Sequence, residues 1–98
     1  GNIFCTDELK FDFNIFKPIC PNPATNEYEI NFTLSAPQEY LLELYNSEGD
    51  KLSTIFSGLG SIGENKIIAN TGDLSAGCYY LLLKLRNEHL WNQLIITK

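Results

Sequence analysis

Apolar and polar residues alternate one by one through most of this chain, and this pattern limits its fold more than any other feature. In residues 28–34, for example, Tyr28, Ile30 and Phe32 share one face and the residues between them are polar. A period of two is that of a β-strand, whose successive side chains point to opposite faces. Seven such segments are predicted as strands, at residues 9–15, 28–34, 40–44, 51–56, 65–70, 78–86 and 91–97. The first is predicted to be half-buried, with Phe13 and Ile15 on the face toward the core.

Turn signals separate these segments. Residues 46–49, Asn-Ser-Glu-Gly, predict a tight turn with Gly49 in the left-handed region. Three glycines between residues 58 and 63 predict a loose loop, and residues 75–77 predict a tight entry to the sixth strand. Short strands at regular spacing, with turns between them, indicate an all-β fold, an immunoglobulin-like antiparallel β-sandwich of about seven strands.

The length of 98 residues allows one hydrophobic core. Three prolines within residues 18–23 interrupt the pattern after the first strand, because proline donates no backbone hydrogen bond. We therefore expect residues 1–18 to be an N-terminal strand or linker and residues 19–98 to be the sandwich, or residues 3–98 to form one domain. The chain begins with Gly-Asn and not Met, as expected of a processed product or an expressed fragment.

Charge and hydropathy exclude two kinds of partner. The net charge is −5, and the seven Lys and Arg residues are scattered along the chain. Nucleic acids and anionic membranes both require clustered cations, so we expect neither as a partner. The longest apolar run has six residues, 78–83, whereas a membrane-spanning helix needs about 20, so we expect no membrane insertion.

The sequence predicts no catalytic residues, no metal site and no cofactor. The single histidine, His89, lies in a predicted turn, and no glycine-framed nucleophile accompanies it. Asn46, Glu48 and Asp50 place oxygens at alternate positions of one turn, but Ca²⁺ needs about six oxygen ligands. Trp91, the only tryptophan, is expected to pack in the core or against a hairpin and not to stack on a sugar.

Three cysteines leave the redox state open. Cys5, Cys20 and Cys78 do not have the spacing of zinc ligands. In an oxidising compartment, Cys5 and Cys20 are candidates for a disulfide that contributes about 3 kcal/mol. Alternatively, all three are unpaired thiols that pack as small apolar residues.

Residues 78–86 are apolar on both faces of the predicted strand. One set is Tyr79, Leu81, Leu83 and Leu85, and the other is Cys78, Tyr80 and Leu82. A sandwich buries one face of each sheet, so the second set needs a cover. The N-terminal strand, an upstream domain and a partner are candidates, and we favour a cover from within the chain.

Four short motifs follow one another along the chain. Pro-Asn-Pro-Ala stands at residues 21–24, and Leu-Glu-Leu-Tyr, a polar turn and Gly stand at residues 42–49. Leu-Ser-Ala-Gly-Cys-Tyr follows at residues 74–79, and Leu-Ile-Ile-Thr-Lys closes the chain at residues 94–98. In their order and spacing, these motifs resemble the C-terminal sorting domain of the type IX secretion system of Bacteroidetes.

This resemblance implies a non-catalytic domain at the C-terminus of a larger exported protein. An outer-membrane translocon would recognise the domain through its last strand or surface. A sortase-like peptidase often removes such domains, and the cargo is then attached to lipopolysaccharide. The resemblance therefore implies passage through the periplasm to the cell surface or the exterior.

The resemblance also assigns roles to individual residues. The residues expected to be recognised by the translocon are Leu94, Ile95, Ile96, Thr97 and Lys98. The hinge and processing region is Pro21, Asn22 and Pro23. The residues expected to determine the fold at turns are Gly49, Gly77 and Tyr79.

An alternative function is a small free-standing secreted immunoglobulin-like module for binding or adhesion. It would bind a protein or a carbohydrate, with Trp91 and the tyrosines as contacts. This alternative applies if residues 3–16 pair into the sandwich. The sequence leaves the cargo, the ligand and the oligomeric state open.

Overall fold

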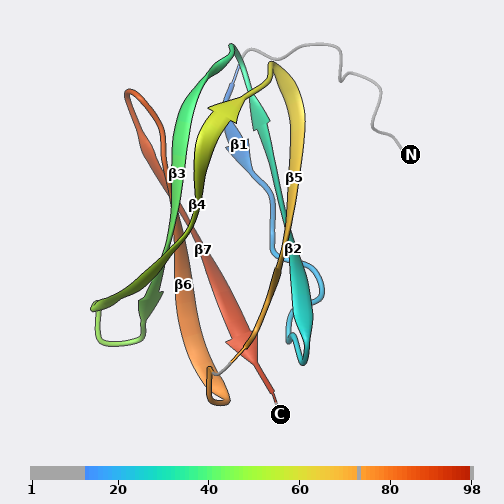
Figure 1. Cartoon of the computed structure of the whole chain (residues 1–98), viewed down its shortest axis with the longest axis vertical. Coiled ribbons are helices and arrows are strands. Elements are labelled where there is room, and N and C mark those ends of the chain that lie inside the picture. Colours follow the sequence, from blue (N-terminus) through green and yellow to red (C-terminus); the bar gives the residue numbers. More distant parts are fainter. Residues whose placement is uncertain (1–12, 73, 98) are drawn as a thin grey trace.

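The computed structural model describes residues 13–72 and 74–97, and within them it has seven β-strands and no helix. The strands form two antiparallel sheets that lie face to face as the layers of a sandwich (Figure 1). The strands are β1 (Ile15–Phe16), β2 (Glu27–Leu34), β3 (Gln38–Asn46), β4 (Lys51–Gly60), β5 (Gly63–Asn70), β6 (Gly77–Lys84) and β7 (His89–Ile96). The prediction of an all-β, immunoglobulin-like antiparallel sandwich is confirmed.

The two sheets differ in size. One has three strands in the order β1-β2-β5, and the other has four in the order β4-β3-β6-β7. All neighbouring strands are antiparallel. The last strand, β7, lies at an edge of the larger sheet, with β6 as its only neighbouring strand among the described residues.

The core lies between the sheets, where the alternation of the sequence places apolar side chains. Large fully buried residues come from both layers: Tyr28, Ile30, Phe32, Leu34, Leu42, Leu81, Leu83, Leu94 and Ile96. The rings of Phe32 and Tyr40 meet across the layers, with centroids 4.8 Å apart. Burial of each large apolar side chain contributes about 1.5–3 kcal/mol, so this layer supplies most of the driving force for folding.

The first strand differs from its prediction. Residues 9–12 lie outside the described residues, and the observed strand is only β1. Phe13 and Ile15 were expected to face the core, but they are 72% and 47% exposed, so this expectation is wrong. Directly opposite residues of an antiparallel pair share a face. Phe16 opposes the buried Phe32 and therefore turns inward, which leaves Ile15 outside.

The loop predicted for residues 58–63 is also wrong, because most of it is strand. β4 continues to Gly60 and β5 begins at Gly63, so two residues connect the layers. The Asn65 side chain closes this connection. Its Oδ1 accepts a hydrogen bond from the backbone N–H of Ser61 at 3.0 Å, and its Nδ2 donates to the carbonyl of Ser61 at 2.9 Å.

The turn between β3 and β4 follows its sequence signals. Gly49 has a φ of +90°, a conformation that glycine adopts without a steric penalty. The Asn46 Oδ1 accepts hydrogen bonds from the backbone N–H groups of Glu48 and Asp50, both at 2.9 Å. The Asn46 side-chain oxygen, which was considered as a ligand for Ca²⁺, thus stabilises the turn.

Gly77 and Tyr79 lie at the start of β6. Tyr79 is buried, and its hydroxyl donates a hydrogen bond to the backbone carbonyl of Ser75 at 2.7 Å. This bond ties the preceding turn to the first residues of the strand.

Candidate recognition site at the last strand

The end of β7 places its residues alternately inside and outside the sandwich. Leu94 and Ile96 point into the core and are buried. Ile95 points outward and is 37% exposed, and Thr97 is exposed as well. Lys98 lies outside the described residues. The predicted recognition segment is therefore partly core and partly surface.

The free edge of β7 is partly covered by two residues that we call the clasp, Asn22 and Ala24. The Asn22 side-chain amide donates to the carbonyl of Gln93 at 3.1 Å and accepts from the N–H of Ile95 at 2.9 Å. The Ala24 N–H donates to the carbonyl of Ile95 at 2.8 Å, and its carbonyl accepts from the N–H of Thr97 at 2.9 Å. Three outward backbone groups of β7 and the N–H of Thr97 directly after it are thereby satisfied.

Pro21, Asn22 and Pro23 lie where the chain leaves one sheet for the other. Residue 20 pairs with β2, and residue 24 forms a parallel bridge with β7. All three residues of the predicted hinge are exposed. The prolines have no N–H, so they present no donor on the outer side of the clasp.

The described thiols are unpaired. Cys20 is exposed, Cys78 is half-buried, and both are free. The Gln93 Nε2 donates a hydrogen bond to Cys78 Sγ at 3.0 Å. Cys5 lies outside the described residues, so the two alternatives for Cys5 and Cys20 remain predictions.

The outward edge of β7 has unpaired backbone groups at Trp91 and Gln93, before the segment that the clasp covers, when only the described residues are considered. N–H and C=O groups alternate in direction along a strand, so those of Trp91 point outward like the carbonyl of Gln93. The Trp91 N–H, the Trp91 carbonyl and the Gln93 N–H pair with no other described residue. Asn92 lies between Trp91 and Gln93. Its side-chain amide donates hydrogen bonds to the carbonyls of Phe16 and Lys17 at 3.1 and 2.7 Å and so connects β7 to the other sheet.

Trp91 was expected to pack in the core or against a hairpin, and the structure excludes the core and places its ring against Tyr45 of the β3–β4 hairpin. Trp91 is 53% exposed on the outer face of the sheet, and its ring meets that of Tyr45 with centroids 5.2 Å apart. Because β6 separates β3 from β7, the rings lean toward each other across β6. Leu82, the β6 residue opposite Trp91, is only 3% exposed. This ring pair, Trp91 and Tyr45, gives Leu82 a cover from within the chain.

A buried carboxylate lies beside the ring pair. Glu43 is 3% exposed, and its Oε1 accepts a hydrogen bond from the Tyr45 hydroxyl at 2.8 Å. Its oxygens form ion pairs with Lys51 Nζ at 2.9 Å and Lys84 Nζ at 3.7 Å. The hydrogen bond from Lys51 is the main cause that lowers the pKa of Glu43, against the opposing effect of burial. The same contacts with Glu43 raise the pKa of Lys51 and of Tyr45.

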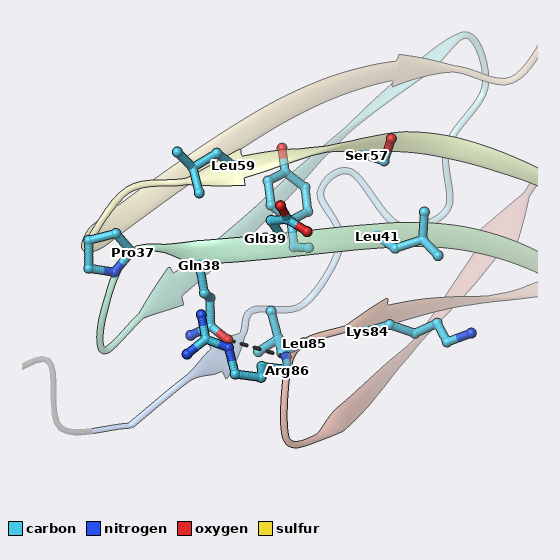
Figure 2. Close-up of a pocket in the computed structure, with 10 residues that line it drawn as sticks. Pro37, Gln38, Glu39, Leu41, Ser57, Leu59, Lys84, Leu85 and Arg86 are labelled. Carbon is cyan, nitrogen blue, oxygen red and sulfur yellow. Dashed lines mark hydrogen bonds between the residues drawn. The ribbon is translucent and has the colours of Figure 1, made fainter.

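A shallow hollow lies between β3, β4 and the end of β6 (Figure 2). Gln38 Oε1 accepts a hydrogen bond there from the backbone N–H of Arg86 at 3.3 Å. Glu39, Lys84 and Arg86 bring charges of both signs to its rim (Figure 2). None of its lining residues comes from β7 or the clasp, so the hollow is separate from the last strand.

The other candidates for chemistry are isolated. His89 opens β7 and is exposed. In the described part of the chain, no group of three or more His, Cys, Asp and Glu side chains is placed to hold a metal ion. Residues 13–72 and 74–97 include no helix with the length and hydropathy needed to cross a membrane.

One protein family matches nearly the whole chain: the family model described as the secretion system C-terminal sorting domain covers residues 18–97. The chain belongs to this family. A sorting domain of the type IX system marks its protein for export through the periplasm to the cell surface or the extracellular space, and the family is non-catalytic. A search of curated proteins found no significant match to this sorting domain.

The sequence motifs mark the two ends of this site separately and do not indicate the contact between them. Residues 21–23 and residues 94–98 were singled out, but the clasp joins Asn22 to β7 over more than 70 positions of chain. One sequence signal was present. An asparagine between two prolines keeps both a donor and an acceptor in its side chain, where the flanking backbone has no N–H.

Proposed function

We propose that an outer-membrane translocon recognises this sorting domain through the end of β7. The proposed contact residues are Leu94, Ile95, Ile96, Thr97 and Lys98. The observation that supports this most directly is the position of β7 at a sheet edge, where the strand ends at the C-terminus of the domain (Figure 1). Leu94 and Ile96 anchor the strand in the core, while Ile95 and Thr97 offer exposed side chains to a partner.

The proposal extends to the N-terminal side of the domain. Pro21, Asn22 and Pro23 are proposed as the hinge and the region accessible to a sortase-like peptidase, and their exposure supports this. Residues 19–98 are proposed as the sorting unit after an N-terminal segment, 1–18. The pairing of β1 with β2 favours a unit that begins earlier, as in the alternative of one domain over residues 3–98. Gly49, Gly77 and Tyr79 are proposed to maintain the turns.

The test is export of a reporter that carries the full 98-residue chain at its C-terminus, in a bacterium with a type IX system. The variant Ile95→Asp with Thr97→Asp changes only outward side chains of the strand end. We expect the reporter to accumulate inside the cell. The matched control is Ile68→Asp on β5, because Ile68 is also an exposed strand isoleucine but lies in the other sheet. Equal export of both variants would refute recognition through this strand end.

Deletion of residues 94–98 is a poorer test, because it removes Leu94 and Ile96 from the core. Loss of large core side chains costs about 2–5 kcal/mol each. A deleted domain would therefore fail to fold, and loss of export would not separate recognition from folding.

A second candidate function is ligand binding by the outer face of the four-stranded sheet. The exposed ring of Trp91 beside Tyr45 is the observation that favours it, since exposed aromatic rings stack on sugars and on protein side chains. A glycan array probed with the full chain tests the carbohydrate version. Binding that Trp91→Ala abolishes would support this function, and an array without any binding would remove it.

A further inference from the structure

The outward edge of β7 is one continuous row of backbone groups with two different halves. From the Trp91 N–H to the Thr97 N–H, donors and acceptors follow one another at the spacing of a strand. The first three groups, on Trp91 and Gln93, have no partner among the described residues. The next four, from the Gln93 carbonyl onward, are bonded to Asn22 and Ala24.

We infer that this edge is the docking site for an extended strand of a partner protein, with Trp91 and Gln93 as its open entry and the clasp as a releasable guard. The inference rests on the proposed function and specifies how the strand would be recognised. An extended polypeptide is the fitting ligand, because the row offers backbone donors and acceptors in the pattern that an added strand satisfies.

The clasp already imitates an added strand. The Asn22 side-chain amide supplies one donor and one acceptor, as a peptide group would, and the Ala24 backbone supplies the next pair. The flanking prolines stop this pairing from extending outward, as is usual where proteins protect a sheet edge. The four groups from the Gln93 carbonyl to the Thr97 N–H are thus kept paired until a partner strand replaces the clasp.

Release of the clasp begins most easily at Asn22. Asn22 is exposed, and two side-chain hydrogen bonds, to the carbonyl of Gln93 and the N–H of Ile95, hold it at the edge. Ala24 is buried, but it contributes only one methyl group to the core. A strand seated on Trp91 and Gln93 meets Asn22 first, and each step then exchanges one hydrogen bond for another at little net cost.

Amide hydrogen exchange of the full chain, followed by NMR, tests the two halves of the edge. The Trp91 and Gln93 amides are expected to exchange quickly, and those of Ile95 and Thr97 slowly. Asn22→Ala is expected to speed exchange at Ile95 by about threefold to tenfold, as for the loss of one hydrogen bond. Protection of Trp91 and Gln93 equal to that of Ile95 would overturn the inference, because the entry would already be occupied.

The export assay tests strand docking with a matched pair of variants. Gln93→Pro removes one outward N–H without removing a bond to β6, whereas Gln93→Ala removes the same side chain and keeps the N–H. We expect Gln93→Pro to export about tenfold less reporter than Gln93→Ala, because proline cannot donate to an added strand. Thr97→Pro against Thr97→Ala repeats the comparison at the guarded end. Circular dichroism confirms that each variant is folded.

The outcomes separate this inference from the proposed function. If Ile95→Asp with Thr97→Asp blocks export but both proline variants match their alanine controls, the partner recognises side chains and strand docking is wrong. If neither set affects export, the proposed function fails as well. Asn22→Ala must retain export across the outer membrane, because the clasp covers the edge and is not itself a contact of the translocon. Cleavage by the peptidase, in whose proposed region Asn22 lies, is not part of this readout. Loss of export in that variant would overturn the role given to the clasp.

Discussion

Glu43 lies on the outer face of a sheet, where water usually solvates a carboxylate, and yet it is almost fully covered. Its oxygens are bonded instead to Tyr45, Lys51 and Lys84. An amide keeps the shape and loses the charge-assisted bonds. We expect Glu43→Gln to lower the free energy of unfolding by about 1 kcal/mol, measured by urea denaturation at neutral pH. Glu48→Gln, at an exposed turn, is the control, and equal stability of the two variants would contradict the prediction.

The same residue predicts a pH dependence of stability. The pKa of Glu43 is lower in the folded protein than its ordinary value, mainly because of the Lys51 hydrogen bond. When the pKa of a carboxyl group is lower in the folded state than in the unfolded state, its ionised form stabilises the fold. This stabilisation is complete above the pKa of the unfolded state and disappears as the pH falls through the pKa of the folded state. Between about pH 6 and about pH 3, the wild type should therefore lose more stability than Glu43→Gln. If the free energies of unfolding of the two proteins change with pH in parallel over this range, folding does not stabilise the ionised carboxylate of Glu43.

Gly60 is buried at the end of β4, where the chain passes close to the core. A methyl group on its Cα would overlap Leu34 Cδ1 and lie 3.3 Å from Tyr40 Cδ1. We expect Gly60→Ala to lower the free energy of unfolding by about 1–3 kcal/mol, as is typical of overpacking. Thermal melting measures the change, and Ser57→Ala on the exposed surface of the same strand should leave the melting temperature unchanged. An unaltered melting temperature for Gly60→Ala would mean that the two sheets separate easily at this end.

The ring pair links β7 to β3 across the strand between them, so its effect belongs to the strands and not to either ring alone. In a double-mutant cycle with Trp91→Leu and Tyr45→Leu, we expect a coupling of about twofold to tenfold in the unfolding equilibrium constant. A cycle of Trp91→Leu with Leu59→Ala is the control, because Leu59 is exposed on β4. Additive effects in the first cycle would show that the rings do not hold β7 on the sheet.

The strands were predictable because the face of a side chain depends on local alternation, and residues 27–34 follow it closely. Phe13 and Ile15 failed because their exposure depends on the register of β1 with β2. The site was predictable only as motifs at residues 21–23 and 94–98. The clasp and the ring pair each join segments that other strands separate in sequence, so no local pattern indicates them.

At the level of the whole domain, the segment proposed for recognition and the core share residues, so recognition should depend on folding. Phe32 is buried in the layer opposite β7, and Phe32→Ala is expected to cost about 3–5 kcal/mol. That is a large part of the roughly 5–15 kcal/mol that stabilises a typical domain. We expect export of the reporter to fall with the folded fraction, measured by thermal melting, while Phe13→Ala removes an exposed ring and leaves export unchanged. If Phe32→Ala is largely unfolded and still exported like the wild type, the signal is a linear peptide and not an edge built by the fold.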